Sequence, residues 1–158
     1  MMMTNKSIID HPALLQYMFY PMKSNYRDYH QHIHTVHIEV EEGVTLGGRL
    51  HFADFDAPTI LFWHGNGEIA SDYDDTQEYV KMGINFLVVE FRGYGESDGT
   101  PTGSNLLSDS ITVYHKIPDI LKEHGIKSDQ LFIMGRSLGC IAAVEVANVA
   151  QDNISGLI

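Results

Sequence analysis

Three short runs of apolar residues constrain the fold of this chain more than any other feature. They are Thr59–Trp63, Ile84–Val89 and Leu131–Met134, and none of them alternates regularly with polar residues. Such runs are typical of strands that are covered on both faces, because neither face then presents polar side chains to water. Segments with helical spacing follow each run, so we predict a parallel sheet with right-handed crossovers and helices on both faces.

The helices predicted after these strands lie at 71–82, 103–124 and 138–150. In the second of them, apolar residues recur at helical spacing at Ile111, Tyr114, Ile117 and Leu121. Pro118 falls inside this segment and has no N–H to donate. It therefore predicts a kink or a break in that helix.

The segment before these runs predicts an antiparallel hairpin. His32–Val40 is rich in β-branched residues that alternate with glutamate near its end, which is typical of a strand. Val44–Phe52 predicts a second strand, and Gly43 predicts the tight turn between the two. Further upstream, Asp10 before His11-Pro12 predicts the N-cap of a helix over Ala13–Phe19.

Composition limits the class of partner and the compartment. The 158 residues include 10 Lys and Arg against 21 Asp and Glu, a formal charge of −11, which repels nucleic acids and anionic lipid heads. No apolar stretch near the N-terminus is long enough for a secretory signal or a membrane span. The single cysteine, Cys140, cannot form an internal disulfide and is expected to be a small buried side chain. We expect a cytoplasmic protein with no nucleic-acid partner and no membrane span.

The pentapeptide Gly135-Arg136-Ser137-Leu138-Gly139 matches the pattern G-x-S-x-G at a predicted junction of strand and helix. There a serine can occupy a strained turn that exposes its hydroxyl above the carboxyl ends of parallel strands. We predict Ser137 as a nucleophile and the N–H of Leu138 as an oxyanion donor. Alternatively, Ser137 only caps the helix that follows it, but this leaves the two glycines unexplained.

The segment His64-Gly65-Asn66-Gly67 directly follows the first apolar run. An acyl-transfer site needs a second N–H donor from a loop after an earlier strand, and the flanking glycines allow a backbone that aims an N–H inward. We favour the amide of Asn66 as this donor, with Gly65 second, and expect His64 to support the loop. The alternative is a glycine-rich turn that binds no ligand.

A third segment runs from Phe91 to Gly99 with the sequence FRGYGESDG. Its three glycines predict a tightly folded loop beside the mouth of the site. A dinucleotide site is disfavoured, because the full G-x-G-x-x-G pattern is interrupted by Asp98 and the loop carries two acids. A structural loop in which Arg92 pairs with a nearby carboxylate or carbonyl is favoured.

Together these three segments resemble the α/β-hydrolase superfamily, and within it the Bem46-like serine hydrolases. The resemblance covers about residues 61–147 and implies a mostly parallel sheet with an antiparallel N-terminal hairpin, Ser137 as nucleophile, and the amides of Asn66 and Leu138 as oxyanion donors. We expect residues 1–158 to form one incomplete α/β-hydrolase domain. Residues 1–31 are its helical lead-in, and residues 32–158 are the sheet with its covering helices.

The resemblance also implies that the acid and the histidine of the site follow later strands. Residues 154–158 resemble the start of another buried parallel strand, so we expect the chain to be truncated or completed by another polypeptide. His64 is the one histidine near the predicted site, and it is disfavoured as a base. The acidic residues of 68–78 are expected to be a solvated face at a helix start, with no metal-ligand spacing and no cofactor.

Two functions remain in competition on these residues. The first is a serine hydrolase that acts on a small-molecule ester, thioester or amide through an acyl-enzyme, and that is inactive here because the acid and base are missing. The second is a non-catalytic module, a truncated product or pseudoenzyme. It would use the open sheet edge near Ile154–Ile158 for self-association, strand exchange or partner binding.

Overall fold

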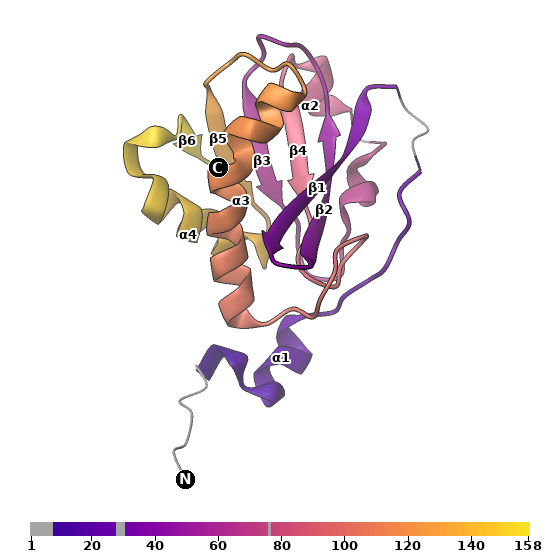
Figure 1. Cartoon of the computed structure of the whole chain (residues 1–158), viewed down its shortest axis with the longest axis vertical. Helices are drawn as coiled ribbons and strands as arrows, with labels where there is room; N and C mark the ends of the chain where they lie inside the picture. Colours follow the sequence, from indigo (N-terminus) through magenta and orange to yellow (C-terminus); the bar gives the residue numbers. More distant parts are fainter. Residues whose placement is uncertain (1–7, 28–30, 76) are drawn as a thin grey trace.

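The structure is a computed structural model that describes residues 8–27, 31–75 and 77–158. One six-stranded sheet forms its centre, with the strand order β1-β2-β4-β3-β5-β6 (Figure 1). The strands are β1 Ile33–Glu41, β2 Val44–His51, β3 Thr59–Trp63, β4 Asn85–Val89, β5 Leu131–Gly135 and β6 Gly156–Leu157. The α-helices are α1 Pro12–Met18, α2 Glu78–Lys81, α3 Gly103–Glu123 and α4 Gly139–Ala150, and the 3-10 turns are η1 Ile8–Asp10, η2 Ala70–Tyr73 and η3 Gln151–Asn153.

The pairing of the strands confirms the predicted mixed sheet. β1 and β2 are antiparallel, with Gly43 at φ 74° in the turn between them, and β2 is also antiparallel to β4. β3 pairs in parallel with both β4 and β5, and β6 continues the parallel part beside β5. Because β3 is central and its neighbours run the same way, the carboxyl ends of β3, β4 and β5 meet at one edge.

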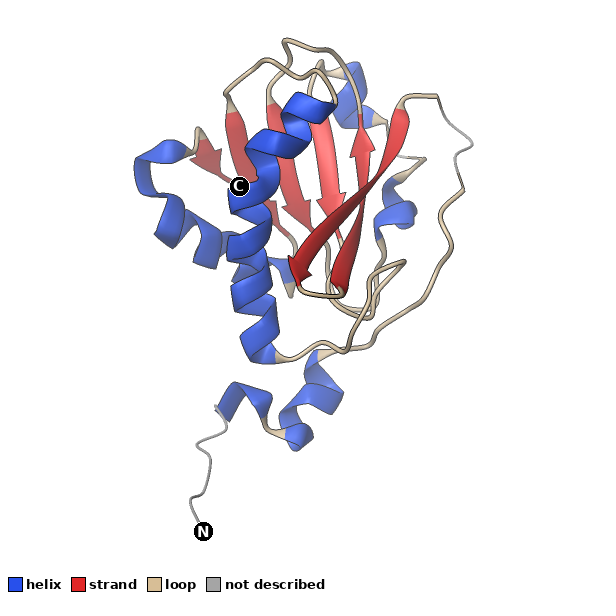
Figure 2. Ribbon diagram, in the orientation of Figure 1, coloured by secondary structure: helices blue, strands red, loops and turns tan. Residues whose placement is uncertain are grey.

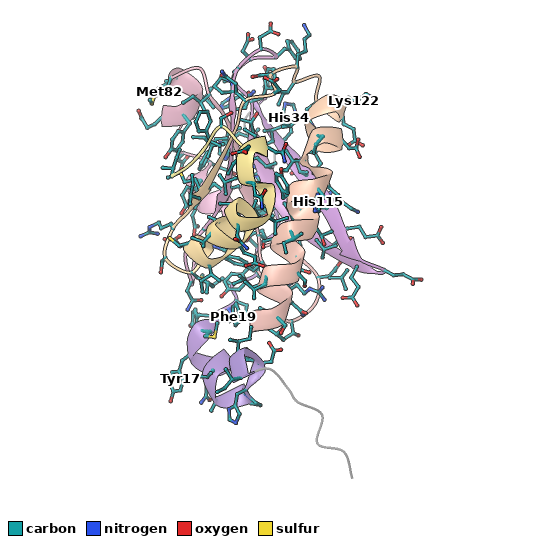
Figure 3. All side chains as sticks on the ribbon, turned by 90° about the vertical axis from the view of Figure 1, so that its left-hand side faces the viewer. Tyr17, Phe19, His34, Met82, His115 and Lys122 are labelled. Atoms are coloured by element: carbon teal, nitrogen blue, oxygen red, sulfur yellow. The ribbon has the colours of Figure 1, made fainter. Side chains whose placement is uncertain are left out.

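Side chains of the central strands pack alternately into two core layers. On β3, Leu61 and Trp63 belong to the layer that α3 and α4 cover, where they meet Ile117 and Val146 among others. Ile60 and Phe62 belong to the opposite layer, together with aromatic residues contributed by η2 and α2. Helical structure therefore covers both faces of the sheet, as the near-continuous apolar runs predict (Figure 2).

The prediction of one helix over residues 71–82 is wrong. Within the described part of this segment, the helical structure consists of the short turn η2 and the single-turn helix α2. Acidic side chains here bind groups outside a regular helix, because Asp72 accepts a hydrogen bond from the N–H of Ile69 at 3.0 Å and Asp74 pairs with Arg49. Aspartate also has low helix propensity, and Gly83 at φ 74° ends the segment.

Pro118 is predicted to kink or break its helix. It does not break it, because α3 runs from Gly103 to Glu123 without interruption. Pro118 lies on the exposed side of the helix. There the carbonyl that loses its hydrogen-bond donor can turn toward water, so the helix tolerates the proline. None of the helices in the described ranges is both long and apolar enough to cross a membrane.

The N-terminal helix, α1, lies beyond the edge of the sheet at which β3 and β4 end, where their arrowheads point (Figures 1 and 2). Its N-cap is His11, whose Nδ1 accepts a hydrogen bond from the N–H of Ala13 at 3.2 Å, and not Asp10 as predicted. Asp10 instead accepts bonds from the N–H and the hydroxyl of Ser104 at 2.8 and 2.5 Å. The carboxylate therefore fastens the N-terminal segment to the first turn of α3.

Candidate active site

Ser137 occupies a sharp turn between β5 and α4. Its φ is 52°, and Gln151 is the one other non-glycine residue with positive φ in the described part of the chain. The turn is closed by a hydrogen bond from the N–H of Gly139 to the carbonyl of Arg136 at 2.9 Å. Ser137 is exposed, and its hydroxyl forms no hydrogen bond with any residue that the structure describes. The strained, outward-facing geometry that the sequence predicts is therefore present.

Close packing of the backbone explains the two glycines of this turn. A side chain on Gly135 would overlap the carbonyl of Gly139, and a side chain on Gly139 would overlap the carbonyls of Trp63 and His64. The turn is thus pressed against the end of β3. Cys140, predicted to be buried, is exposed instead, with its thiol 3.2 Å from the carbonyl of Gly135. It lies on the outer side of the first turn of α4.

The loop after β3 lies beside this turn. The N–H of Arg136 donates to the carbonyl of Trp63 at 3.1 Å, which joins the turn to the start of the loop. The N–H of Gly65 donates to Glu68 Oε2 at 2.6 Å and is therefore already engaged. Within the described residues, the N–H groups of Asn66 and Leu138 make no hydrogen bond. Of the two loop amides considered from sequence, the geometry leaves that of Asn66 open to a ligand.

His64 holds this loop from inside the protein. It is fully buried, with Nδ1 2.8 Å from the carbonyl of Gly65 and Nε2 2.7 Å from Glu90 Oε2. Glu90 is also fully buried, and its other carboxylate oxygen accepts bonds from the N–H of Ala70 and the hydroxyl of Tyr26. Both nitrogens of His64 are occupied, so the ring is not free to take a proton from Ser137.

Of the acidic residues predicted to form a solvated face, Asp72, Asp75 and Glu78 are exposed as predicted, but Glu68 and Asp74 are turned inward. Glu68 accepts bonds from the N–H of Gly65 and from the hydroxyl of Tyr73, the latter at 2.9 Å, and forms an ion pair with Arg136. Asp74 forms a pair with the fully buried Arg49 at 2.7 Å. Because a buried guanidinium needs a compensating charge, the carboxylate of Asp74 is turned toward Arg49. Glu68 also ties the loop to the turn that carries Ser137.

The loop after β4 has the structural role that was favoured from its sequence. Arg92 Nε and Nη2 donate to the two carboxylate oxygens of Asp109 at 2.7 and 2.8 Å, and Nη1 donates to Glu41 at 2.8 Å. The pairing with Asp109 raises the pKa of Arg92, so the guanidinium stays charged. Sequence reasoning missed Tyr94 of this loop, although the flanking Gly93 and Gly95 marked it as a residue in an unusual backbone.

The other histidines lie away from Ser137 or outside the described residues. His30 falls among the latter. His11 caps α1, His37 is 3.6 Å from Glu96, and His51 is 3.6 Å from Asp74. His34 packs edge-on against His124, which also contacts the carbonyl of Ile120. No histidine in the described ranges forms a hydrogen bond with Ser137 Oγ.

The strand-turn-helix geometry and the neighbouring loop are matched by comparison with known proteins. The family model described as serine aminopeptidase, S33, matches residues 56–158, which is more than half of the chain. The chain belongs to this hydrolase family. The S33 match includes both the loop after β3 and the turn at Ser137, and it ends with β6.

Curated relatives of this S33 chain include two proteins of very different size. It is 36% identical over 104 residues to a multifunctional-autoprocessing repeats-in-toxin of Vibrio cholerae, a match that covers 63% of the chain and 2% of the toxin. It is 33% identical over 104 residues to protein bem46 of Schizosaccharomyces pombe, covering 64% of the chain and 33% of that protein. The predicted Bem46-like grouping is confirmed, and the chain matches only a minor part of each relative.

Solved structures similar to the S33 chain have the α/β-hydrolase fold, which confirms the predicted fold class. An esterase of Pyrococcus furiosus superposes with a TM-score of 0.67 at 20% identity, covering 88% of this chain and 54% of the esterase. Est1E of Butyrivibrio proteoclasticus, solved with ferulic acid bound, gives a TM-score of 0.63 at 21% identity, covering 77% of this chain and 50% of Est1E. At these identities the likeness concerns the fold alone.

Proposed function

We propose that the protein is a serine hydrolase in which Ser137 attacks the carbonyl of a small-molecule ester, thioester or amide. The observation that carries this proposal is the exposed serine at φ 52° in a turn pressed against the end of the neighbouring strand. Membership of the S33 hydrolase family supports it. The open amides of Asn66 and Leu138 are the proposed oxyanion donors, and the engaged amide of Gly65 is not.

The proposed reaction proceeds through an acyl-enzyme. Ser137 Oγ attacks the carbonyl carbon while its proton passes to a general base, and the carbonyl oxygen becomes an oxyanion bound by the two amides. The bond to the leaving group then breaks, the leaving group takes up the proton, and the acyl group stays on Ser137. Water deprotonated by the same base releases the carboxylic acid and restores the serine hydroxyl.

The general base and its orienting acid are proposed to come from outside the described residues. His64 is locked against Glu90, and no other histidine of the described residues forms a hydrogen bond with Ser137 Oγ. Without a base, serine is a weak nucleophile, and the loss of a triad member lowers turnover by roughly 10⁴–10⁶-fold. We therefore expect these 158 residues alone to hydrolyse esters very slowly, while the turn and the oxyanion amides stay assembled.

Chemical rescue tests this proposal directly. The chain is treated with a fluorophosphonate probe with and without added imidazole, which can diffuse to the exposed hydroxyl and act as the base. We expect imidazole to raise the labelling rate at Ser137 by about tenfold, below the 10²–10⁴-fold of a positioned base, because a diffusing base is not held in place. Labelled sites are identified by peptide mass spectrometry.

Ser137→Ala is the matched control for this experiment, because it removes only the hydroxyl. Labelling that persists in this variant would belong to another nucleophile, such as the exposed Cys140. A folded wild-type chain that stays unlabelled at Ser137 at every imidazole concentration would contradict the proposed function. It would favour the alternative below.

The alternative function is a non-catalytic module that associates through the free side of β6. This strand pairs with β5 on one side and ends the sheet on the other. Leu157 and Ile158 are 50% and 60% exposed, and Val144 on the neighbouring α4 is 58% exposed. Exposed apolar residues beside an unpaired strand favour pairing with another chain, either a partner or a second copy.

A cytoplasmic location is part of the proposal. The strongly acidic charge and the single cysteine support a protein of a reducing compartment that does not bind nucleic acids or anionic membranes. Fractionation of the host cells with antibody detection would test the location.

A further inference from the structure

The loop carrying Asn66 is fixed at three points, and one of them lies on Asn66 itself. His64 is held by Glu90, and the N–H of Gly65 is held by Glu68. The third point is the side chain of Asn66, whose Oδ1 accepts a hydrogen bond from the hydroxyl of Tyr94 at 2.7 Å. This third point, unlike the first two, acts directly on the residue whose main-chain N–H is proposed to bind the oxyanion.

The hydroxyl of Tyr94 joins three separate segments. The N–H of Tyr20 lies 2.8 Å from this hydroxyl and 2.7 Å from Asn66 Oδ1. An amide N–H can only donate, so the atom of Asn66 that faces it is the oxygen, and the O–H of Tyr94 must donate to the same atom. The N-terminal segment, the loop after β3 and the loop after β4 therefore meet at one hydroxyl.

The sequence of the loop after β4 places Tyr94 in this position. Gly93 and Gly95 have φ values of 78° and 48°, and a side chain on Gly95 would overlap the carboxylate of Glu90. The two glycines let the chain turn so that Tyr94 is fully buried, with its ring 5.5 Å from the ring of His64 and 5.8 Å from that of Phe91. The ring is thus held by packing on two sides.

The hydroxyl stays protonated under ordinary conditions. Burial raises the pKa of Tyr94 to about 12, and the nearby Glu90 acts in the same direction. Below that pH the group is neutral and can donate to Asn66. A protonated donor on a packed ring is a rigid restraint, because neither the ring nor the hydroxyl needs to reorganise during a reaction.

We propose that Tyr94 is a positioning residue that fixes Asn66, and through it the direction in which the main-chain N–H of Asn66 meets the oxyanion formed at Ser137. The proposal rests on the proposed function. Tyr94 does not touch the reacting atoms; it acts on them through Asn66. In this role Tyr94 does not contribute to substrate binding. Loss of its hydroxyl should therefore slow the chemical step without weakening the initial binding of the substrate.

The variant Tyr94→Phe tests the proposal, because it keeps the ring and removes one hydroxyl. We expect the maximal rate of fluorophosphonate labelling of Ser137, kinact, to fall by about tenfold in the imidazole-supported reaction, while KI stays within about twofold. Loss of a whole oxyanion donor costs roughly 10²–10³-fold, and a misdirected donor costs less. Tyr79→Phe is the matched control, because among the described residues the one hydrogen bond of its hydroxyl is to Met134 Sδ, at 3.7 Å, and its loss should leave both constants unchanged.

A double-mutant cycle with Asn66→Ala separates positioning from a general effect on folding. If Tyr94 acts through Asn66, Tyr94→Phe should slow labelling in the wild-type background and have no further effect in the Asn66→Ala background. Equal losses in both backgrounds, or a wild-type rate in Tyr94→Phe, would overturn the inference while the proposed function stands. If wild-type Ser137 is not labelled at all, the proposed function fails, and this inference fails with it.

Discussion

At residue 139, a glycine is required by its surroundings and not by its own backbone angles. A side chain there would overlap the main-chain oxygens of Trp63 and His64, which belong to the end of β3 and the loop after it. Main-chain atoms cannot rotate away as a flexible side chain can, so the turn itself would have to move. The same glycine therefore supports both the stability of the fold and the placement of Ser137.

We predict that Gly139→Ala lowers the free energy of unfolding by about 2–4 kcal/mol, because it forces overlap in a packed region. Gly43→Ala is the control. Gly43 has positive φ but no atom within 4 Å of an added side chain, so its substitution should cost about 1–2 kcal/mol from the backbone angle alone. Urea denaturation of both variants measures the difference. Equal losses would show that the close approach of β3 to the turn is not what requires Gly139.

The residues of the candidate site differ in how far the sequence alone could place them. Ser137 and the loop at His64 follow from local patterns, because each lies at the carboxyl end of a predicted parallel strand. Tyr94 and Glu90 could not be found this way, since their partners lie 28 and 26 residues away in sequence. Only the packed fold shows which loop residues turn inward.

At the scale of elements, one ion pair joins the loop after β4 to α3. Arg92 and Asp109 are 9% and 6% exposed and form two hydrogen bonds, and Glu41 of β1 adds a third at the surface. Removing one partner of a buried pair leaves an uncompensated charge, which costs more than the pair itself contributes.

We predict that Arg92→Met lowers the free energy of unfolding by about 3–5 kcal/mol, because Asp109 is left buried and unpaired. The double variant Arg92→Met/Asp109→Leu should recover most of this loss, since no charge then remains in the interior. Thermal and chemical denaturation of the wild type, both single variants and the double variant provide the measurement. A double variant as unstable as Arg92→Met would show that packing, and not the unpaired carboxylate, causes the loss.

Helix prediction failed where side-chain partners outweighed local pattern. In residues 71–82 the pattern predicts one helix, but Asp72 and Asp74 bind groups that the sequence does not reveal, and the segment becomes η2 and α2. In α3, Pro118 predicts a kink or a break, and packing of the buried residues on both sides of it leaves the helix without a break. Tertiary contacts override local preference in both segments.

At the scale of the whole molecule, the strand order follows from the sequence pattern to a large extent. Apolar runs without alternation predict the central parallel strands, and the alternating segments predict the hairpin at the edge. The sequence also predicts a parallel strand at residues 154–158, and β6 is paired in parallel with β5. It predicts burial for that strand, whereas Leu157 and Ile158 are at least half exposed, because burial depends on neighbours that a single segment does not specify.

We predict that the chain self-associates through this edge at micromolar concentration. The double variant Leu157→Lys/Ile158→Lys should raise the dissociation constant at least about tenfold, equivalent to about 1.4 kcal/mol, because charged residues oppose edge pairing. Met82→Lys is the control, since Met82 is 70% exposed but lies outside the edge. Sedimentation velocity across a concentration series measures the association. Unchanged association in the double variant would place the contact elsewhere.

The backbone angle of Ser137 has a consequence for how this sequence can change over time. A serine at φ 52° carries a penalty of roughly 1–2 kcal/mol that a glycine would not. Selection for a robust fold alone would thus tend to replace this side chain, and under the proposed function a benefit from its reactivity opposes that drift. In lineages that have abandoned chemistry at this turn, position 137 should be among the first to become glycine.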